Sequence, residues 1–245
     1  MNLSEIQRQV RLLGDTAIAE HSQRFFKTGK GDYGEGDKFL GIRVPVLRKQ
    51  ARQFKQLPFE VVSELLFSEY HEERLLCLLI LVHQFSKGST TDQQAIYRFY
   101  LKHTHWVNNW DLVDTSAEHI VGAWLFTRSR KPLYELARSK MLWERRIAIM
   151  STYHYIKKNE CDQTLKLAKI LHQDPEDLIQ TAVGWMLREV GKRQLDLEEG
   201  FLKRYYHNMP RTMLRYAIEK FPTEKRKAYL SGTIEHNIRD SVDAK

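Results

Sequence analysis

The sequence is poor in the residues that mark disulfide-bonded, loop-rich or membrane-spanning proteins. Only two of its 245 residues are cysteines, six are prolines and twelve are glycines. Cys77 and Cys161 have no metal-ligand spacing, which excludes a disulfide framework and favours a reducing compartment, so we expect a cytoplasmic protein. The longest apolar run, residues 75–82, is far shorter than the roughly 20 residues of a membrane-spanning helix. We therefore expect no membrane partner.

Positive charge is what the chain has in excess. Its 39 Lys and Arg residues outnumber 31 Asp and Glu, which gives a formal net charge of +8. The hydrophobic share of 42% and the charged share of 29% are typical of a folded globular protein. The charge favours a polyanionic partner, but by itself it does not distinguish nucleic acid from a membrane surface.

The periodicity of the apolar residues predicts an almost entirely α-helical chain. Apolar positions recur at steps of three and four residues, and the period-two alternation of strands is absent. Comparable helical segments recur about every 35 residues along the chain. Such a repeat is typical of an α-solenoid, and a plain helical bundle is the alternative interpretation. We expect one domain over residues 1–245, with residues 232–245 as a poorly ordered tail. The predicted repeats open near Glu72, Asn109, Glu144, Leu178 and Thr212.

The excess charge is concentrated near the C-terminus. Residues 186–230 hold eleven basic and six acidic residues, a net of +5. Basic pairs four residues apart share a helix face there and could contact phosphates, although a solvated surface is the simpler interpretation of any single residue. Together with a glycine-rich loop and one arginine of a central helix, they form our predicted DNA contacts: Lys27, Lys30, Arg145, Arg188, Lys192, Arg193, Arg211 and Arg215.

Several catalytic motifs are excluded by their context. Residues 29–34 match the G-x-G-x-x-G pattern of dinucleotide-binding proteins, but a helical pattern precedes them where that fold needs a strand. The ten histidines include no compact set with the spacing of metal ligands. The chain has no nucleophile elbow of a serine hydrolase. We expect neither a metal nor a cofactor.

One group of residues combines aromatic rings with charge. Trp110 and Asp114 are four residues apart, so they share one face of a predicted helix. A carboxylate on an otherwise apolar helix needs a cation, for which Arg145 and Arg146 in the next repeat are candidates, and Trp185 follows one repeat later. These side chains could converge on a concave face. The alternative is that both tryptophans belong to the core and that Asp114 is a surface acid.

The sequence resembles the AlkD family of DNA alkylation-repair glycosylases, which are built from HEAT-like helical repeats. The resemblance extends over nearly the whole chain and is carried by four motifs, at residues 27–38, 41–45, 71–76 and 109–114. It implies a HEAT-like α-solenoid whose concave, basic face binds double-stranded DNA. We expect a monomer, because the sequence has neither a coiled-coil seam nor a long apolar stripe.

The resemblance also implies the catalytic residues. The two tryptophans of the family's site match Trp110 and Trp185, and its essential aspartate matches Asp114. Its arginine falls at Arg145 or Arg146, and the spacing to Trp185 favours Arg146. The implied activity is base excision repair by a monofunctional glycosylase, without a metal or cofactor. It would remove cationic N3- or N7-alkylated purines, such as 3-methyladenine and 7-methylguanine, while the base stays in the duplex.

The implied chemistry suits these residue types. An alkylated purine is already cationic, so it can leave without a general acid, and a carboxylate can stabilise the positive charge that develops on the sugar. Aromatic rings attract the cationic nucleoside through their π faces. The main alternative is a non-catalytic HEAT-like repeat module that binds damaged or branched DNA, and a weaker one is a scaffold for an acidic peptide.

Overall fold

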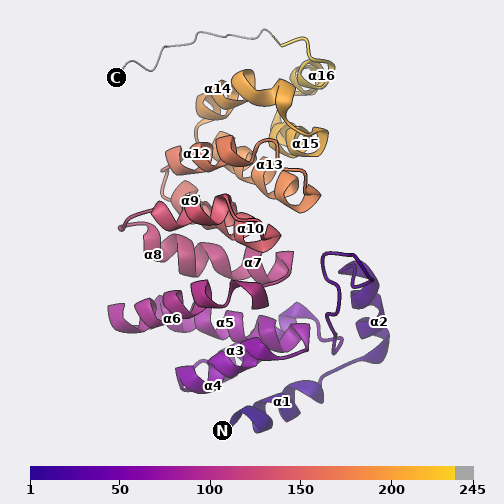
Figure 1. Cartoon of the computed structure of the whole chain (residues 1–245), viewed down its shortest axis with the longest axis vertical. Coiled ribbons are helices and arrows are strands. Elements are labelled where there is room, and N and C mark those ends of the chain that lie inside the picture. Colours follow the sequence, from indigo (N-terminus) through magenta and orange to yellow (C-terminus); the bar gives the residue numbers. More distant parts are fainter. Residues whose placement is uncertain (235–245) are drawn as a thin grey trace. The chain divides into compact units, whose positions relative to one another are not determined.

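The computed structural model describes residues 1–234, and their regular structure is helical except for one isolated bridge between Lys38 and Tyr70. This confirms the predicted all-α fold (Figure 1). The chain divides into two compact units, residues 1–127 and a second that begins at Arg128. The prediction of a single domain is not tested by this division. The predicted tail, apart from residues 232–234, lies outside the described residues.

The first unit is arranged around helix α5, which is buried along most of its length. Leu76, Leu78, Ile80 and Leu81 are completely buried, because α5 packs against α3, α4, α6 and α7. Short 3₁₀ turns follow α4 and α6, and a π-helical turn, Glu118–Gly122, connects α7 to α8. The helices of this unit are α1 (Leu3–Arg11), α2 (Thr16–Phe25), α3 (Val44–Phe54), α4 (Phe59–Glu64), α5 (His71–Lys87), α6 (Thr90–Lys102), α7 (Trp110–Ala117) and α8 (Ala123–Leu125).

The second unit has α13 as its central helix, which packs against α10, α12, α14 and α15. α13 and α15 approach closely at Gly184, where a Cβ atom would lie 2.4 Å from the carbonyl oxygen of Met213. Pro210 and Pro222 stand immediately before helices, as their fixed φ angles favour. The helices are α9 (Lys131–Ala137), α10 (Leu142–Ser151), α11 (Tyr153–Ile156), α12 (Asp162–Leu171), α13 (Asp177–Gly191), α14 (Leu195–Tyr205), α15 (Arg211–Ala217) and α16 (Thr223–Ser231).

Within each unit the central helix packs against helices next to it in the chain, as α5 does with α4 and α6 and α13 with α12 and α14. It also packs against the helix two further on, as α5 does with α7 and α13 with α15, which is the arrangement of an α-solenoid of HEAT-like repeats. The predicted repeat starts agree with the helices. Asn109 caps α7, and the other four predicted starts fall in the first turns of α5, α10, α13 and α15. Among the described residues, none of the helices combines the length and the apolar composition that a membrane crossing needs.

Candidate functional site

Helix α7 begins with the aromatic and acidic residues that the sequence singled out. The side chain of Asn109 caps this helix by accepting a hydrogen bond from the backbone N–H of Trp110 at 2.8 Å. The Trp110 ring is half-buried and stacks on Phe26, with ring centres 5.3 Å apart, while Phe25 meets it edge-on at 6.0 Å. Trp110 is therefore part of an aromatic cluster that reaches the surface.

Asp114 lies one turn further along α7 and is half-buried. It lines a groove of about 480 Å³ together with α3, α5 and the π-helical turn. Asp114 is the only carboxylate in this lining, which also holds two arginines and two histidines. The lining residues are Arg48, Ala51, Arg52, Leu79, Val82, His83, Ser86, Asp114, Thr115 and His119.

The inner side of Asp114 faces the core of the first unit. Burial, and to a lesser extent the charge of Asp114, raises the pKa of the Tyr100 hydroxyl. That hydroxyl is hydrogen-bonded to Ser116 at 2.9 Å. The charge of Asp114 therefore acts on the buried Tyr100 hydroxyl, while Asp114 also lines the groove that contains Arg48 and Arg52.

A buried charged network holds the start of α7. His71, at the first position of α5, is only 2% exposed, and its ring nitrogens lie 2.8 Å from Asp111 and 3.3 Å from Asp37. Arg74 donates to the other oxygen of Asp37 at 2.7 Å, and Asn108 donates to that same oxygen at 3.0 Å. The network connects α5, the turn before α7 and the glycine-rich loop.

The two glutamates that follow His71 fasten the N-terminal part of the unit. Glu72 accepts hydrogen bonds from the backbone N–H groups of residues 40–42, at 2.8 to 3.2 Å. Glu73 forms an ion pair with Arg11 of α1 at 2.7 Å and also accepts from Ser68. The motif at residues 71–76 is therefore structural, because its charged side chains tie the surrounding loops to the buried end of α5.

The glycine-rich loop presents its predicted DNA contacts to solvent. Lys27 and Lys30 are exposed, and the Lys27 ammonium lies 5.9 Å from the centre of the Tyr33 ring. Lys27 has a φ of 50°, in the left-handed region. The loop returns to the core at Gly41, whose φ of 79° and close approach to α2 require the absence of a side chain.

In the second unit, Trp185 and Arg146 lie on the packed pair α13 and α10. Trp185 is half-buried, its indole N–H donates to Glu189 at 3.2 Å, and its ring centre lies 6.0 Å from that of Tyr153. Arg146 is only 4% exposed and donates to the backbone carbonyl of Leu178 at the start of α13. Trp185 is thus open to solvent on part of its surface, whereas Arg146 is largely enclosed.

Several of the predicted phosphate-binding residues already have protein partners. Arg145 forms a two-pronged ion pair with Asp174, at 2.7 and 3.4 Å, and also donates to two backbone carbonyls. Arg188 pairs with Glu219, and Lys192 lies 2.6 Å from Glu189. Arg193 and Arg211 are exposed but also donate hydrogen bonds, to the side chain of Asn159 and to the backbone carbonyl of Leu230, and Arg215 is exposed as well.

The structure places the four predicted catalytic residues as two pairs, each within one unit. Trp110 and Asp114 share α7, and Arg146 and Trp185 lie on neighbouring helices. The convergence of the two pairs stays a prediction. Sequence reasoning missed the cations of the groove, Arg48 among them, although the arginines at 48 and 52 have the same four-residue spacing as the basic pairs singled out elsewhere.

Within residues 1–234, three or more His, Cys, Asp or Glu side chains do not come together in a way that could hold a metal ion.

Comparisons with known proteins agree with this architecture. A family model described as "DNA alkylation repair enzyme" matches residues 6–221, so the chain belongs to the DNA alkylation repair enzyme family. Among solved structures it is similar to a predicted DNA alkylation repair enzyme from Enterococcus faecalis, with a TM-score of 0.68 and 18% identity. That likeness covers 86% of this chain and 97% of the other, and it shows a shared fold. A search of curated proteins found no significant match.

Proposed function

We propose that the protein is a monofunctional DNA glycosylase that hydrolyses the N-glycosidic bond of cationic N3- or N7-alkylated purines in duplex DNA. The observation that carries the proposal is the position of Asp114. Its carboxylate is the single negative group in a groove lined by Arg48, Arg52, His83 and His119. Membership of a DNA alkylation repair family supports the choice of substrate.

The proposed reaction breaks the N-glycosidic bond between the sugar C1′ and N9 of a purine that carries its alkyl group on N3 or N7. The base leaves with the bonding electrons and becomes neutral, so no acid has to protonate it, and positive charge passes to the sugar. The Asp114 carboxylate stabilises that charge in the transition state and orients a water molecule toward C1′. The water supplies the new hydroxyl on the sugar, and its other proton passes through Asp114 to solvent.

Trp110 serves the same step through its π system. Its ring is supported from behind by Phe26, so it is held in one orientation on the helix that carries Asp114. An aromatic face attracts a nearby cation by about 0.5–2 kcal/mol. We assign the same role to Trp185. We assign Arg146 to fixing a backbone phosphate or to orienting the Asp114 carboxylate. Among the other predicted cationic residues, the exposed Lys27, Lys30, Arg193, Arg211 and Arg215 supply affinity for phosphates without sequence preference.

The proposal is tested by release of free base from a duplex. Plasmid DNA methylated with a simple methylating agent is incubated with the full-length protein, and the released 3-methyladenine and 7-methylguanine are measured by mass spectrometry. Release above the spontaneous rate, without added metal and in the presence of a chelator, is the expected result. A protein that binds the DNA in a salt-dependent manner but releases no base would instead be the non-catalytic module.

A further inference from the structure

The first unit carries a row of basic side chains that continues beyond the groove of Asp114 and to which the function above assigns no ligand. The row consists of the four cations Arg48, Arg52, Lys55 and Lys87, with the imidazole of His83 among them, and we call it the α3–α5 cation row. We propose that this row binds the phosphodiester backbone of one DNA strand beside Asp114. The inference rests on the proposed function, because it gives the strand a path past the reacting nucleotide.

The spacing along α3 and its C-terminal end places three of these cations on one side. Arg48, Arg52 and Lys55 follow one another at steps of four and three residues, and all three are exposed. They span roughly 10 Å along the helix axis at 1.5 Å per residue, which is about the axial length of three nucleotides of one strand. The two arginines line the groove of Asp114, and the lysine lines the neighbouring pocket.

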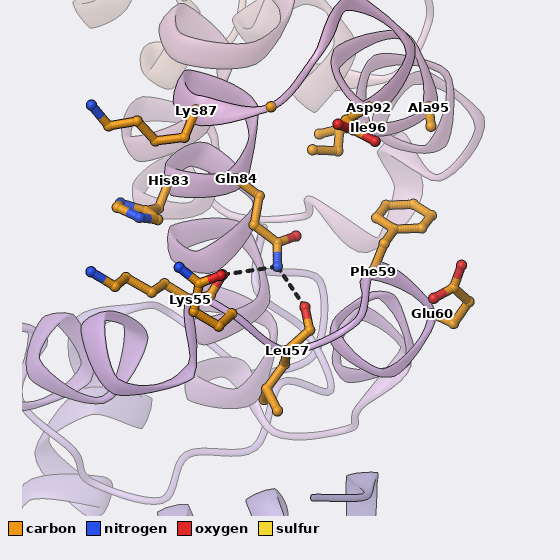
Figure 2. A pocket seen from close by; sticks show the side chains of 12 residues that line it. Lys55, Leu57, Phe59, Glu60, His83, Gln84, Lys87, Asp92, Ala95 and Ile96 are labelled. Atoms are coloured by element: carbon orange, nitrogen blue, oxygen red, sulfur yellow. Dashed lines mark hydrogen bonds between the residues drawn. The ribbon is translucent and has the colours of Figure 1, made fainter.

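Helix α5 continues the row. His83 lines both the groove of Asp114 and the neighbouring pocket of about 440 Å³, so the two hollows adjoin at this residue. Lys87 lies one helical turn beyond His83. Figure 2 shows the side chains of Lys55, His83 and Lys87 extending toward the same side of the pocket. A chain of phosphates could therefore contact all three in succession.

The acids of this pocket do not neutralise the row. Glu60 and Asp92 lie across the pocket, away from Lys55, His83 and Lys87 (Figure 2). The Asp92 carboxylate accepts hydrogen bonds from the backbone N–H and the hydroxyl of Ser89 at the start of α6, at 2.9 and 2.7 Å. It is committed to capping that helix, so the cationic side keeps its charge for a ligand.

The row is held in place by the packing of its two helices. The side-chain amide of Gln84 on α5 donates to the carbonyl oxygens of Leu57 and Lys55, at 2.8 and 3.2 Å (Figure 2). These bonds fix the C-terminal end of α3 against α5, next to the residue that both hollows share. A fixed spacing of cations lowers the entropy that is lost when an extended polyanion binds.

The test compares two double variants that remove equal charge. In Lys55→Gln/Lys87→Gln the row loses two cations, and in the control Lys49→Gln/Lys102→Gln two exposed lysines of α3 and α6 that line neither hollow are lost. Binding of an undamaged 20-base-pair duplex is followed by fluorescence anisotropy between 50 and 200 mM salt. The row variant should reduce the slope of log K against log salt by about 1.8, because each phosphate contact contributes about 0.9. The control should keep the wild-type slope.

Equal slopes for the row variant and the control would overturn the proposal. This includes the outcome in which the row variant and the control lose the same amount of slope, because the row would then act only as a diffuse source of charge. The measurement needs no catalysis, so its outcome is separate from that of the proposed function. If the wild type releases no base while the row variant still changes the slope, the glycosylase assignment fails and the strand-binding site remains.

Discussion

One imidazole nitrogen of His71 lies 2.8 Å from a carboxylate oxygen of Asp111, the residue that follows Trp110 on α7. The other nitrogen faces Asp37 in the glycine-rich loop at 3.3 Å. Burial by itself would lower the pKa of His71, but the charge of Asp111 and its hydrogen bonds with Asp111 and Asp37 outweigh it and raise the pKa to about 9. At neutral pH, His71 is therefore an imidazolium ion that ties the helix of the candidate site to the loop.

This buried ion pair predicts a pH-dependent stability. The pKa of about 9 in the folded protein exceeds the ordinary value of 6.5, so protonation favours folding. The stabilisation is fully present below about pH 6.5 and is lost as the pH rises through 9. His71→Gln should lower the free energy of unfolding by about 3–5 kcal/mol near neutral pH, because it leaves the buried Asp111 carboxylate without its cation, while Asp37 keeps Arg74.

Urea unfolding at pH 6.5, 8 and 9.5 measures this contribution. The difference between wild type and His71→Gln should shrink as the pH rises, whereas the exposed His105, changed to Gln as a control, should leave the pH dependence unaltered. A constant difference over this range would mean that His71 is neutral in the folded protein.

Substitutions at two glycines of the N-terminal loop distinguish the free-energy cost of a left-handed backbone from the cost of a steric overlap. Gly36 and Gly41 both have positive φ, of 85° and 79°, but a Cβ at Gly36 would meet nothing within 4 Å. A Cβ at Gly41 would lie 1.9 Å from the carbonyl oxygen of Asp15 and 2.7 Å from the amide of Ala19. Gly36→Ala should therefore destabilise the fold by about 1–2 kcal/mol.

Gly41→Ala should cost clearly more, because α2 must shift away from the loop. Thermal unfolding of both variants gives the comparison, and equal melting temperatures would contradict the close packing at this turn. Base release by the two variants at a temperature where both are folded would then show whether the position of the loop matters for activity.

The role assigned to Trp110 predicts a loss of rate rather than a loss of DNA binding. Trp110→Ala should lower the single-turnover rate of base release by about 2- to 30-fold, which corresponds to the 0.5–2 kcal/mol of one cation–π contact. Trp110→Phe, which preserves a ring against Phe26, should retain more of the rate. Trp106, also half-buried in this unit, provides the control Trp106→Ala, which should keep the wild-type rate. Equal losses for Trp106→Ala and Trp110→Ala would remove Trp110 from the mechanism.

The sequence predicted the helices and their repeat well, because apolar periodicity and proline positions are local signals. The start predicted near Asn109 coincides with the cap of α7. The one-turn relation of Trp110 and Asp114 was predictable for the same reason. By contrast, most of the residues that line the groove beside Asp114 come from α3 and α5, far away in sequence, and no local pattern predicts that Arg48 and Asp114 share it.

The sequence was least informative about charged side chains that form ion pairs within the folded protein. The predicted DNA contact of Arg145 stays a prediction, and the sequence did not indicate the two-pronged pair that its guanidinium forms with Asp174. The motif beginning at His71 was recognised only as part of a family pattern, since its role depends on Asp37 and Asp111, which meet it only in the folded chain. Charge counted along a sequence does not separate cations that are free for a ligand from those that hold the fold together.

The central claim is that the Asp114 carboxylate stabilises the positive charge that develops on the sugar as the base departs. It is tested by single-turnover release of 7-methylguanine with enzyme in excess over methylated duplex. Asp114→Asn preserves the shape of the side chain and removes its charge. Glu64→Gln, at an exposed carboxylate at the end of α4, is the matched control. The account predicts that Asp114→Asn lowers the rate by about 100-fold or more while binding and melting temperature stay close to wild type. A rate equal to that of wild type and of Glu64→Gln would contradict it.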